Sequence, residues 1–499
     1  MRHFNKNYLN WDRITSLTNM VYKPLLNINS NNNILNKTFI GQGYTKSITP
    51  NLIVNHFLQN PKIYTPYTPY QSEISQGRLE LFYNYQTMIS EINKQDISVA
   101  SLIDTGQAAM DLVSISKTFN KSKNIYVHEN FNQSILNCMN TRAKHQGMNI
   151  KKFKYTDDID LNDTNSIFIQ SPDNIGNIID LEYIETIPKN IPKILHCNLM
   201  SNIYYDINSD KYDFCFGNGG NFGIPLGYGG PQPIFLSSKK EYIRKLPGKI
   251  VGKSVDTHNK ESYRLALQTR EQHIKRERAT SNICTNQALL AGMSVAWYIY
   301  HGKNEVRNIA NDIYSKTQYL NDNLNGNIIN DSFYDTITIN NKMFNKNILN
   351  DLDNNSINYF KHTNSSRYPN ISFTIDETHT INDIDNLLKY LDYNTSNLNF
   401  NFNTSNNKTL KKRNLNYLNQ DIFNNWNQEQ KIARYLSSLE KKDFSLLDGM
   451  IPLGSCTMKY NSPESMAEVS DPKYNIHPWI DINKTPLGQY YNFRKLNIA

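Results

Sequence analysis

The chain has 499 residues, of which 38% are hydrophobic, and it carries a formal net charge of +8 at pH 7. This length exceeds what one hydrophobic core usually fills, so we expect more than one folded domain. The sequence has no apolar run long enough to cross a membrane and no dense Lys/Arg stripe with interleaved aromatic residues, which argues against a membrane protein and against nucleic-acid partners.

The N-terminal segment, residues 1–38, is polar and asparagine-rich, and we expect a loose lead-in before the fold begins near Phe39. It lacks the apolar core of a secretory signal, so we do not expect secretion. Its basic residues and single acid, Asp12, are typical of an organelle transit peptide, or of the drift toward Asn, Lys, Ile and Tyr seen along the whole chain. The five cysteines are widely spaced and form no CxxC pair, which favours a reducing compartment over a disulfide framework or a zinc site.

The segment YTPYTPYQSEISQGRLE, residues 64–80, crowds polar side chains behind a repeated Tyr-Thr-Pro-Tyr. One interpretation is a proline-stiffened turn that leads into a helix starting near Ser75. The other is a rigid loop that presents hydroxyl and amide groups into a neighbouring active site. Its candidate site residues are Tyr67, Thr68, Tyr70, Gln71 and Glu73.

From Ser98 onward, short apolar runs such as NIYVH, SIFIQ and KILHC alternate with segments of helical period. This alternation predicts an α/β fold with a mostly parallel sheet covered on both faces, in a large domain over residues 39–260. The segment FGNGGNFGIPLGYGGPQPIFL, residues 216–236, is dense in glycine, so we expect close backbone approach or repeated positive φ there. It does not have the strand, GxGxxG and helix order of a dinucleotide site.

A second, smaller α/β domain is expected over residues 261–393. It opens with a long helix that we expect to stop at Gly302. Residues 394–427 read as an asparagine-rich linker, and residues 428–499 as the incomplete start of a further domain. Within that last segment, Ile432, Tyr435, Leu436 and Leu439 have the spacing of a one-sided helix.

For two further motifs, the sequence allows both a structural and a functional interpretation. TREQHIKRER, residues 269–278, fits either a helix start laced with ion pairs or an anion site that uses Arg270 or His273. Cys284 lies near a predicted helix N-terminus, where a thiol is either activated or simply buried and inert.

Six blocks in one order resemble the glycine-decarboxylating P-protein of the glycine cleavage system, a family with the aspartate-aminotransferase-like type I fold of pyridoxal-phosphate (PLP) enzymes. The blocks are FIGQGY (39–44), YTPYQSEISQGRLE (67–80), GYGGP (227–231), KLPGKIVGKSVD (245–256), RLALQTREQHIKRERATSNICT (264–285) and IPLGSCTMKYN (451–461). In that family two related halves form one chain or two subunits, and the lysine that binds PLP lies in the second half. The resemblance implies that residues 39–393 correspond to the first half and residues 430–499 to the opening of the second.

The resemblance implies a degenerate cofactor site in this half. PLP needs a lysine and normally an acid beside its ring nitrogen. Gly220 stands where the lysine is expected, and no lysine lies between Lys211 and Lys239. Asn198 stands in the slot of the acid, and His128 ends a strand where a ring could stack on the cofactor, although a lone histidine there is equally a buried core residue.

The implied activity is glycine decarboxylation, with transfer of the aminomethyl group to the lipoyl group of H-protein, in a dimer or heterotetramer with a chain that carries the PLP lysine. The cytoplasm of a bacterium or the mitochondrial matrix of a eukaryote would be its location. IPLGSCTMKYN offers Ser455, Cys456 and Thr457 as candidate cofactor contacts. The alternative is a truncated, non-catalytic scaffold, whereas Gly220 and Asn198 argue against a self-sufficient aminotransferase.

Overall fold

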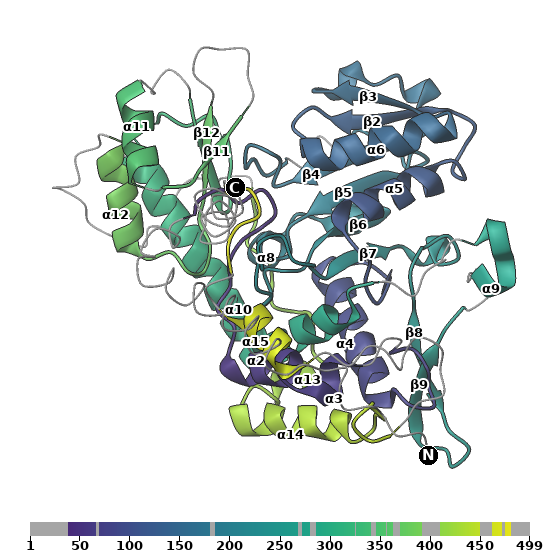
Figure 1. Ribbon diagram of the computed structural model, residues 1–499. Helices are drawn as coiled ribbons and strands as arrows, with labels where there is room; N and C mark the ends of the chain where they lie inside the picture. The colour runs from purple at the N-terminus through teal and green to yellow at the C-terminus, as the bar shows by residue number, and fades with distance from the viewer. Residues whose placement is uncertain are drawn as a thin grey trace, which may run out of the picture.

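Two sheets of different size, joined by a long helix, organise the molecule (Figure 1). The computed structural model describes residues 38–65, 69–179, 185–267, 272–279, 286–324, 326–340, 346–355, 357–362, 370–391, 410–449, 462–471 and 475–480. All structural statements below refer to these residues.

The larger sheet has seven strands in the order β1-β7-β6-β5-β4-β2-β3. Strands β2 to β6 run parallel to one another, and β7 runs antiparallel to both of its neighbours. The mostly parallel α/β sheet predicted from the alternating runs is therefore present. The strands are β1 (Ile97–Ser98), β2 (Asn124–His128), β3 (Asn149–Phe153), β4 (Ser166–Ser171), β5 (Lys193–Cys197), β6 (Phe214–Asn218) and β7 (Ile234–Ser238).

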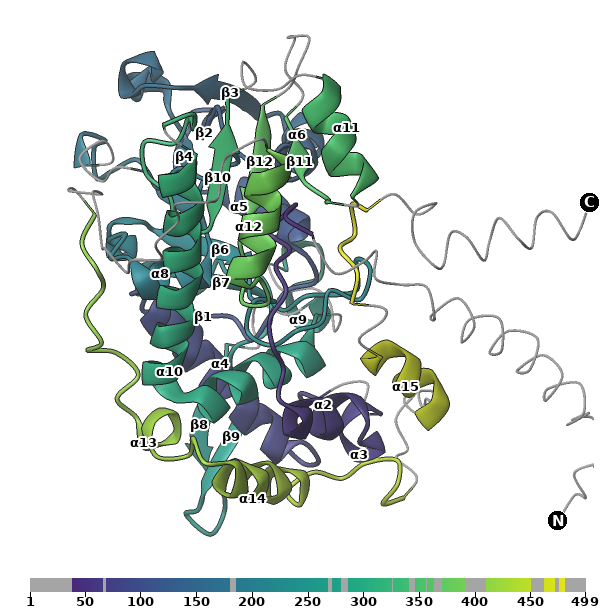
Figure 2. The same cartoon turned by 90° about the vertical axis from the view of Figure 1, so that its left-hand side faces the viewer.

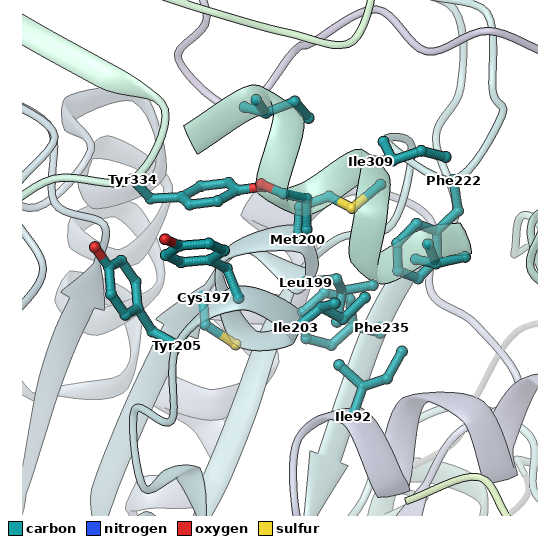
Figure 3. Close-up of a cluster of buried hydrophobic side chains, with 14 of the residues drawn as sticks. Ile92, Cys197, Leu199, Met200, Ile203, Tyr205, Phe222, Phe235, Ile309 and Tyr334 are labelled. Carbon is teal, nitrogen blue, oxygen red and sulfur yellow. The ribbon is translucent and has the colours of Figure 1, made fainter. Parts of the chain in front are cut away.

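Helices cover both faces of this sheet, because successive strand residues point to opposite sides. On β5, Ile194 belongs to the core beneath α5 (Thr105–Ser116) and α6 (Gln133–Gln146), whereas the next residue, Leu195, faces the other core. That second core includes α4 (Gln76–Ile92), α8 (Leu199–Tyr204) and α10 (Ala288–Asn323). Figure 3 shows Leu199 and Ile203 of α8 among the side chains of Ile92, Phe235 and Ile309.

The long helix α10 is interrupted at Gly302, which has φ 69° and ψ 161°. The helix expected to stop at this glycine does lose its helical backbone there, but a second helical stretch resumes immediately and continues to Asn323. A positive φ costs glycine little, so the chain changes direction at this point without a loop. Val306 and Ile309, beyond the break, are buried in the same core as Trp297 before it.

The smaller sheet has three antiparallel strands in the order β10-β12-β11. Its elements are β10 (Thr336–Ile339), β11 (Phe360–Lys361), β12 (Ile371–Thr374), α11 (Lys346–Asn354) and α12 (Ile381–Tyr390). Asp335, just before β10, lies within reach of Asn198, just after β5 of the large sheet. The two sheets therefore meet at the end of β5.

Residues 410–449 pack against the body of the molecule, beside α10. Figure 2 shows this segment descending beside α10 to α13 (Asp421–Asn424) and then α14 (Glu429–Glu440). Leu418 and Phe423 are buried in the core, so residues 410–427 pack against the body even though their composition suggests a linker. The predicted one-sided helix is confirmed as α14, in which Ile432, Tyr435, Leu436 and Leu439 are the buried residues.

The remaining elements lie at the edges of the body. A hairpin of β8 (Val251–Val255) and β9 (Glu261–Leu265) extends along one side in Figure 1. α15 (Pro463–Ser470) lies against α2 (Asn51–Leu58), which is followed by α3 (Pro61–Tyr64), and α9 (Gln272–Lys275) is a single short turn. Among the helices of these described ranges, none is both long and apolar enough to cross a membrane.

Candidate functional site

A cavity of about 370 Å³ opens at the carboxyl ends of the parallel strands. Each of its strand-end residues follows a strand directly or after a short loop: Asn132 after β2, Asp173 after β4, Asn198 after β5 and Asn221 after β6. Ligands of open α/β sheets bind at this edge, because the loops that follow neighbouring parallel strands converge there. The cavity is therefore the candidate ligand-binding site of the large sheet.

Three helices begin at the cavity, and each is capped by the side chain of the residue before it. Asp104 accepts a backbone N–H of α5 at 2.7 Å. Asn132 accepts two from α6 at 3.0 and 3.2 Å, and Asn198 accepts two from α8 at 2.9 and 3.2 Å. A helix N-terminus usually attracts anions through its free N–H groups and its dipole. Here those groups are already partly satisfied, and one cap is a carboxyl group.

Asn198 also joins the two sheets. Its Nδ2 donates to Asp335 Oδ2 at 3.4 Å, and its Oδ1 accepts from Asn221 Nδ2 at 3.2 Å. Thr336 Oγ1 donates to the other carboxyl oxygen of Asp335 at 2.9 Å. Burial raises the pKa of Asp335 to about 6, because the charged carboxylate is costly away from water.

A second buried carboxyl group and a half-buried histidine also line the cavity. Asp173 accepts the backbone N–H of Ile175 at 3.0 Å and of Asn177 at 2.9 Å, yet burial still raises its pKa to about 7. Burial lowers the pKa of His196 to about 4, so its imidazole stays neutral near pH 7. Within the described residues, His196 Nδ1 has no hydrogen-bond partner.

The degenerate cofactor slots are only partly brought together. Asn198 lines the cavity, whereas Gly220 and His128 are not among its lining residues. The backbone N–H of Gly220 donates to Asn218 Oδ1 at 2.7 Å, and a Cβ at Gly220 would overlap the carboxamide oxygen of Gln232. The His128 ring instead meets Phe153 edge-on, with 5.6 Å between centroids.

A short C-terminal segment, residues 475–480, lies across one side of the cavity and fixes two loops. Asn475 Oδ1 accepts the backbone N–H of Leu226 in the glycine-rich loop at 2.6 Å. His477 is buried and donates from Nε2 to the carbonyl of Gly41 at 3.0 Å. Trp479, 41% exposed, lines the cavity itself. Residues from near the C-terminal end of the described chain thus complete a cavity of the large sheet.

The segment after the Tyr-Thr-Pro-Tyr repeat leads into α4, which begins at Gln76, as predicted. Tyr70 is buried; its hydroxyl donates to Asn286 Oδ1 and its ring packs beside Phe82. Gln71 is partly buried, and its Oε1 is a buried oxygen without a partner in the described chain, while Glu73 is exposed. Tyr70 thus packs in the interior, and among the described residues of the motif Gln71 Oε1 and Thr65 Oγ1 are buried atoms without a hydrogen-bond partner.

The other candidate residues fall outside the described parts of the chain. They are Tyr67, Thr68, Arg270, Cys284, Ser455, Cys456 and Thr457, and the side chain of His273.

Sequence reasoning missed most of the cavity. Asp104, Asp173, His196, Asp335 and Trp479 were not candidates, although all of them line it. A signal existed for Asp173, because polar residues that follow a predicted parallel strand gather at the ligand edge. Asp335 and Trp479 come from distant parts of the chain, and only the packing of the smaller sheet and of residues 475–480 brings them there.

The order and direction of the strands, with helices on both faces, define the fold: it is the type I fold of PLP-dependent transferases. A solved glycine decarboxylase (P-protein) of the glycine cleavage system, in inhibitor-bound form, has this fold with a TM-score of 0.64 and 22% identity, over 78% of this chain and 90% of that chain. A C-DES mutant with glycine covalently linked to its PLP cofactor has a TM-score of 0.50 and 14% identity, over 72% of this chain and 97% of that one.

The particular family follows from sequence. A family model described as Glycine cleavage system P-protein matches residues 13–391, and the chain belongs to this family. It is 37% identical over 481 residues to glycine dehydrogenase (decarboxylating) of Psychromonas ingrahamii, covering 93% of this chain and 49% of that protein. It is also 37% identical to the mitochondrial enzyme of Dictyostelium discoideum, covering 96% of this chain and 50% of that protein. The chain therefore spans about half the length of these relatives.

The cavity does not fit the cofactor that the fold implies. None of its described lining residues is a lysine, so the group that would bond to PLP is missing. Asn198 offers an amide where a carboxylate would stabilise a protonated ring. Among the same lining residues there is also no arginine, and the capped helix ends leave little to hold a phosphate.

Proposed function

We propose that this chain supplies the first half of a glycine decarboxylase, and that it decarboxylates glycine only together with a chain that carries the PLP lysine. One observation carries the proposal. The chain belongs to the P-protein family, yet among the described residues that line its cavity there is no lysine or arginine, and Asn198 stands where the ring-nitrogen acid is expected. In the partner, bound PLP would supply the electron sink for the carbanion left by carbon dioxide loss. The aminomethyl group would then pass to the lipoyl group of H-protein.

This chain's contribution would be to close and orient the partner's site. Residues 69–75 lead directly into the helix α4, which favours accurate placement of their side chains. The unpaired Gln71 Oε1 is suited to hold a substrate donor, while buried Tyr70 and its partner Asn286 brace the loop. Exclusion of water around a developing carbanion strengthens such contacts. Tyr67 and Thr68 belong to the same proposed contact region, as do Ser455, Cys456 and Thr457 at the entrance of the second half.

Co-production with the second half of a full-length relative tests the proposal, with lipoylated H-protein present and glycine-dependent carbon dioxide release as the readout. We expect no release from this chain alone and measurable release from the pair. Gln71→Ala should lower release by at least about tenfold, the usual cost of one positioned polar group. Ser72→Ala, at the neighbouring residue, is the matched control and should leave it unchanged.

The alternative is a non-catalytic scaffold that keeps only the assembly surfaces. A pair that copurifies as a stable complex but releases no carbon dioxide would favour the scaffold and contradict the proposed activity. Release from this chain alone would contradict the dependence on a partner.

A further inference from the structure

The cavity at the carboxyl ends of the parallel strands is lined by acidic and neutral polar side chains, and what it binds is a separate question from the proposed decarboxylation. We infer that it is a binding site for a small organic amine, held as an ammonium ion by Asp335 and Asp173, and that it rejects anions of the same size.

The ionisable side chains that line the cavity favour a positively charged ligand. Asp104, Asp173 and Asp335 line it, and no lysine or arginine does among the described residues. Lys46 lines a smaller neighbouring cavity, where Asp376 and Glu377 are also present, so its charge has acidic neighbours there. Desolvation makes an uncompensated charge in such a site expensive. A cation can therefore find opposite charges in this cavity, and an anion cannot.

The helix N-termini reinforce this selectivity. An uncapped N-terminus would offer N–H donors and a positive partial charge to a phosphate or carboxylate. Here α5, α6 and α8 all begin at the cavity, and Asp104, Asn132 and Asn198 accept N–H groups of their first turns. Some of the N–H groups that would bind an anion are therefore occupied by side chains of the protein itself.

Unused polar groups also indicate a ligand. Gln170 is 7% exposed and lines the cavity; its Oε1 accepts the N–H of Asn132 at 2.8 Å, while its Nε2 has no partner among the described residues. His196 Nδ1 and Asn221 Oδ1 are buried without a partner in the same part of the chain. A bound ammonium group can donate to the two acceptors, and a hydroxyl group on the same ligand can accept from Gln170 Nε2.

Aromatic rings complete the pattern. Tyr44 and Trp479 both line the cavity, and ring faces attract ammonium groups. Burial raises the pKa of Tyr44, and the nearby Asp104 charge raises it further. The Tyr44 hydroxyl therefore stays protonated near pH 7. The volume of about 370 Å³ lies at the lower end of the range for small-molecule sites. A compact aliphatic amine matches both the size and the lining.

Isothermal titration of the full chain with four four-carbon ligands tests the inference. 1,4-Diaminobutane, 4-amino-1-butanol, 1,4-butanediol and succinate differ in charge but little in length. We expect the diamine to bind tightest, the amino alcohol next and the diol at least about tenfold more weakly than the diamine, with no binding of succinate. Succinate or inorganic phosphate binding as tightly as the diamine would overturn the inference, and so would the absence of diamine binding up to about 10 mM.

Two variants locate the site. Asp335→Asn keeps the shape of the side chain and should weaken diamine binding at least about tenfold, whereas Asp331→Asn, an exposed neighbour that does not line the cavity, should change it less than about twofold. Trp479→Ala removes a partly exposed ring and should weaken binding severalfold. Thermal unfolding of each variant checks that it is folded. Equal affinity in folded Asp335→Asn and Trp479→Ala would place any amine site elsewhere and overturn the assignment.

Discussion

Arg78 and Asp443 form a buried ion pair across 365 residues of sequence, with 2.7 Å between Nη1 and Oδ2. Their side chains are 9% and 5% exposed. Arg78 lies in the first turn of α4, which begins at Gln76, shortly after Tyr70, and Asp443 lies shortly after the end of α14. The start of α4 and the segment after α14 are thus anchored to each other within one chain.

Removal of one partner from this pair leaves a buried charge without compensation. Arg78 also donates to the carbonyls of Lys62 and Ile63, so it cannot turn toward solvent without losing further hydrogen bonds. We expect Asp443→Ala to lower the free energy of unfolding by about 3–5 kcal/mol. Urea unfolding measures the change.

Asp448→Ala is the matched control, because Asp448 pairs with Lys62 at 2.9 Å in a far more exposed position. Water screens that pair, so the control should lose much less stability. Equal losses in the two variants would show that burial of the Arg78–Asp443 pair does not matter.

At Gly77 the backbone of α4 closely approaches the backbone of α14. A Cβ at this position would overlap the carbonyl oxygen of Leu439, and the Gly77 N–H donates to Asp443 Oδ1 at 2.7 Å. Gly77→Ala should therefore push α14 away and cost about 1–3 kcal/mol in thermal unfolding. At Gly252 the nearest atom to an added Cβ is 3.4 Å away, so Gly252→Ala tests the same substitution without the clash. A Gly77→Ala protein as stable as Gly252→Ala would mean that the two helices do not pack this closely.

The raised pKa of Asp335 predicts how stability depends on pH. The ordinary value is 3.8, and burial raises the pKa in the folded chain to about 6. Between those values the folded chain binds more protons than the unfolded chain, so this group's contribution to stability falls as the pH rises from about 4 to about 6. The carboxamide introduced by Asp335→Asn cannot ionise, so the variant lacks this contribution.

The stability of Asp335→Asn relative to the natural chain should accordingly increase over that pH window by roughly 2–3 kcal/mol and then level off. Denaturant unfolding at several pH values from about 4 to about 7.5 brackets the window and gives the difference directly. A difference that stays constant across the series would mean that Asp335 ionises as it does in an exposed position.

The fold was largely predictable because local patterns determine it. The runs NIYVH, SIFIQ and KILHC are strands in which nearly every residue is buried, the pattern of a parallel sheet covered on both faces. The spacing of Ile432, Tyr435 and Leu436 likewise determined the buried face of α14. Gly302 was only half predictable, because sequence shows that the backbone must break but not that a helix resumes at once.

The site was less predictable because its parts are distant in sequence. Asn198 was a candidate by position, yet its contact with Asp335 depends on how the smaller sheet docks, and its contact with Asn221 depends on the path of the loop after β6. Tyr70 stays a predicted contact residue, and its burial beside Phe82 could not be read from the sequence around it. The raised pKa values of Asp335 and Asp173 arise from burial, which no local pattern reveals.

Borohydride trapping shows most directly whether this half of the protein holds a cofactor of its own. The purified chain is mixed with PLP, reduced, digested and mapped by mass spectrometry, while its absorbance is followed beforehand. We predict no aldimine absorbance and no lysine labelled stoichiometrically, because Gly220 and Asn198 stand where the lysine and the acid would be needed. A single lysine that carries one pyridoxyl group per chain would contradict the dependence on a partner that bears the cofactor.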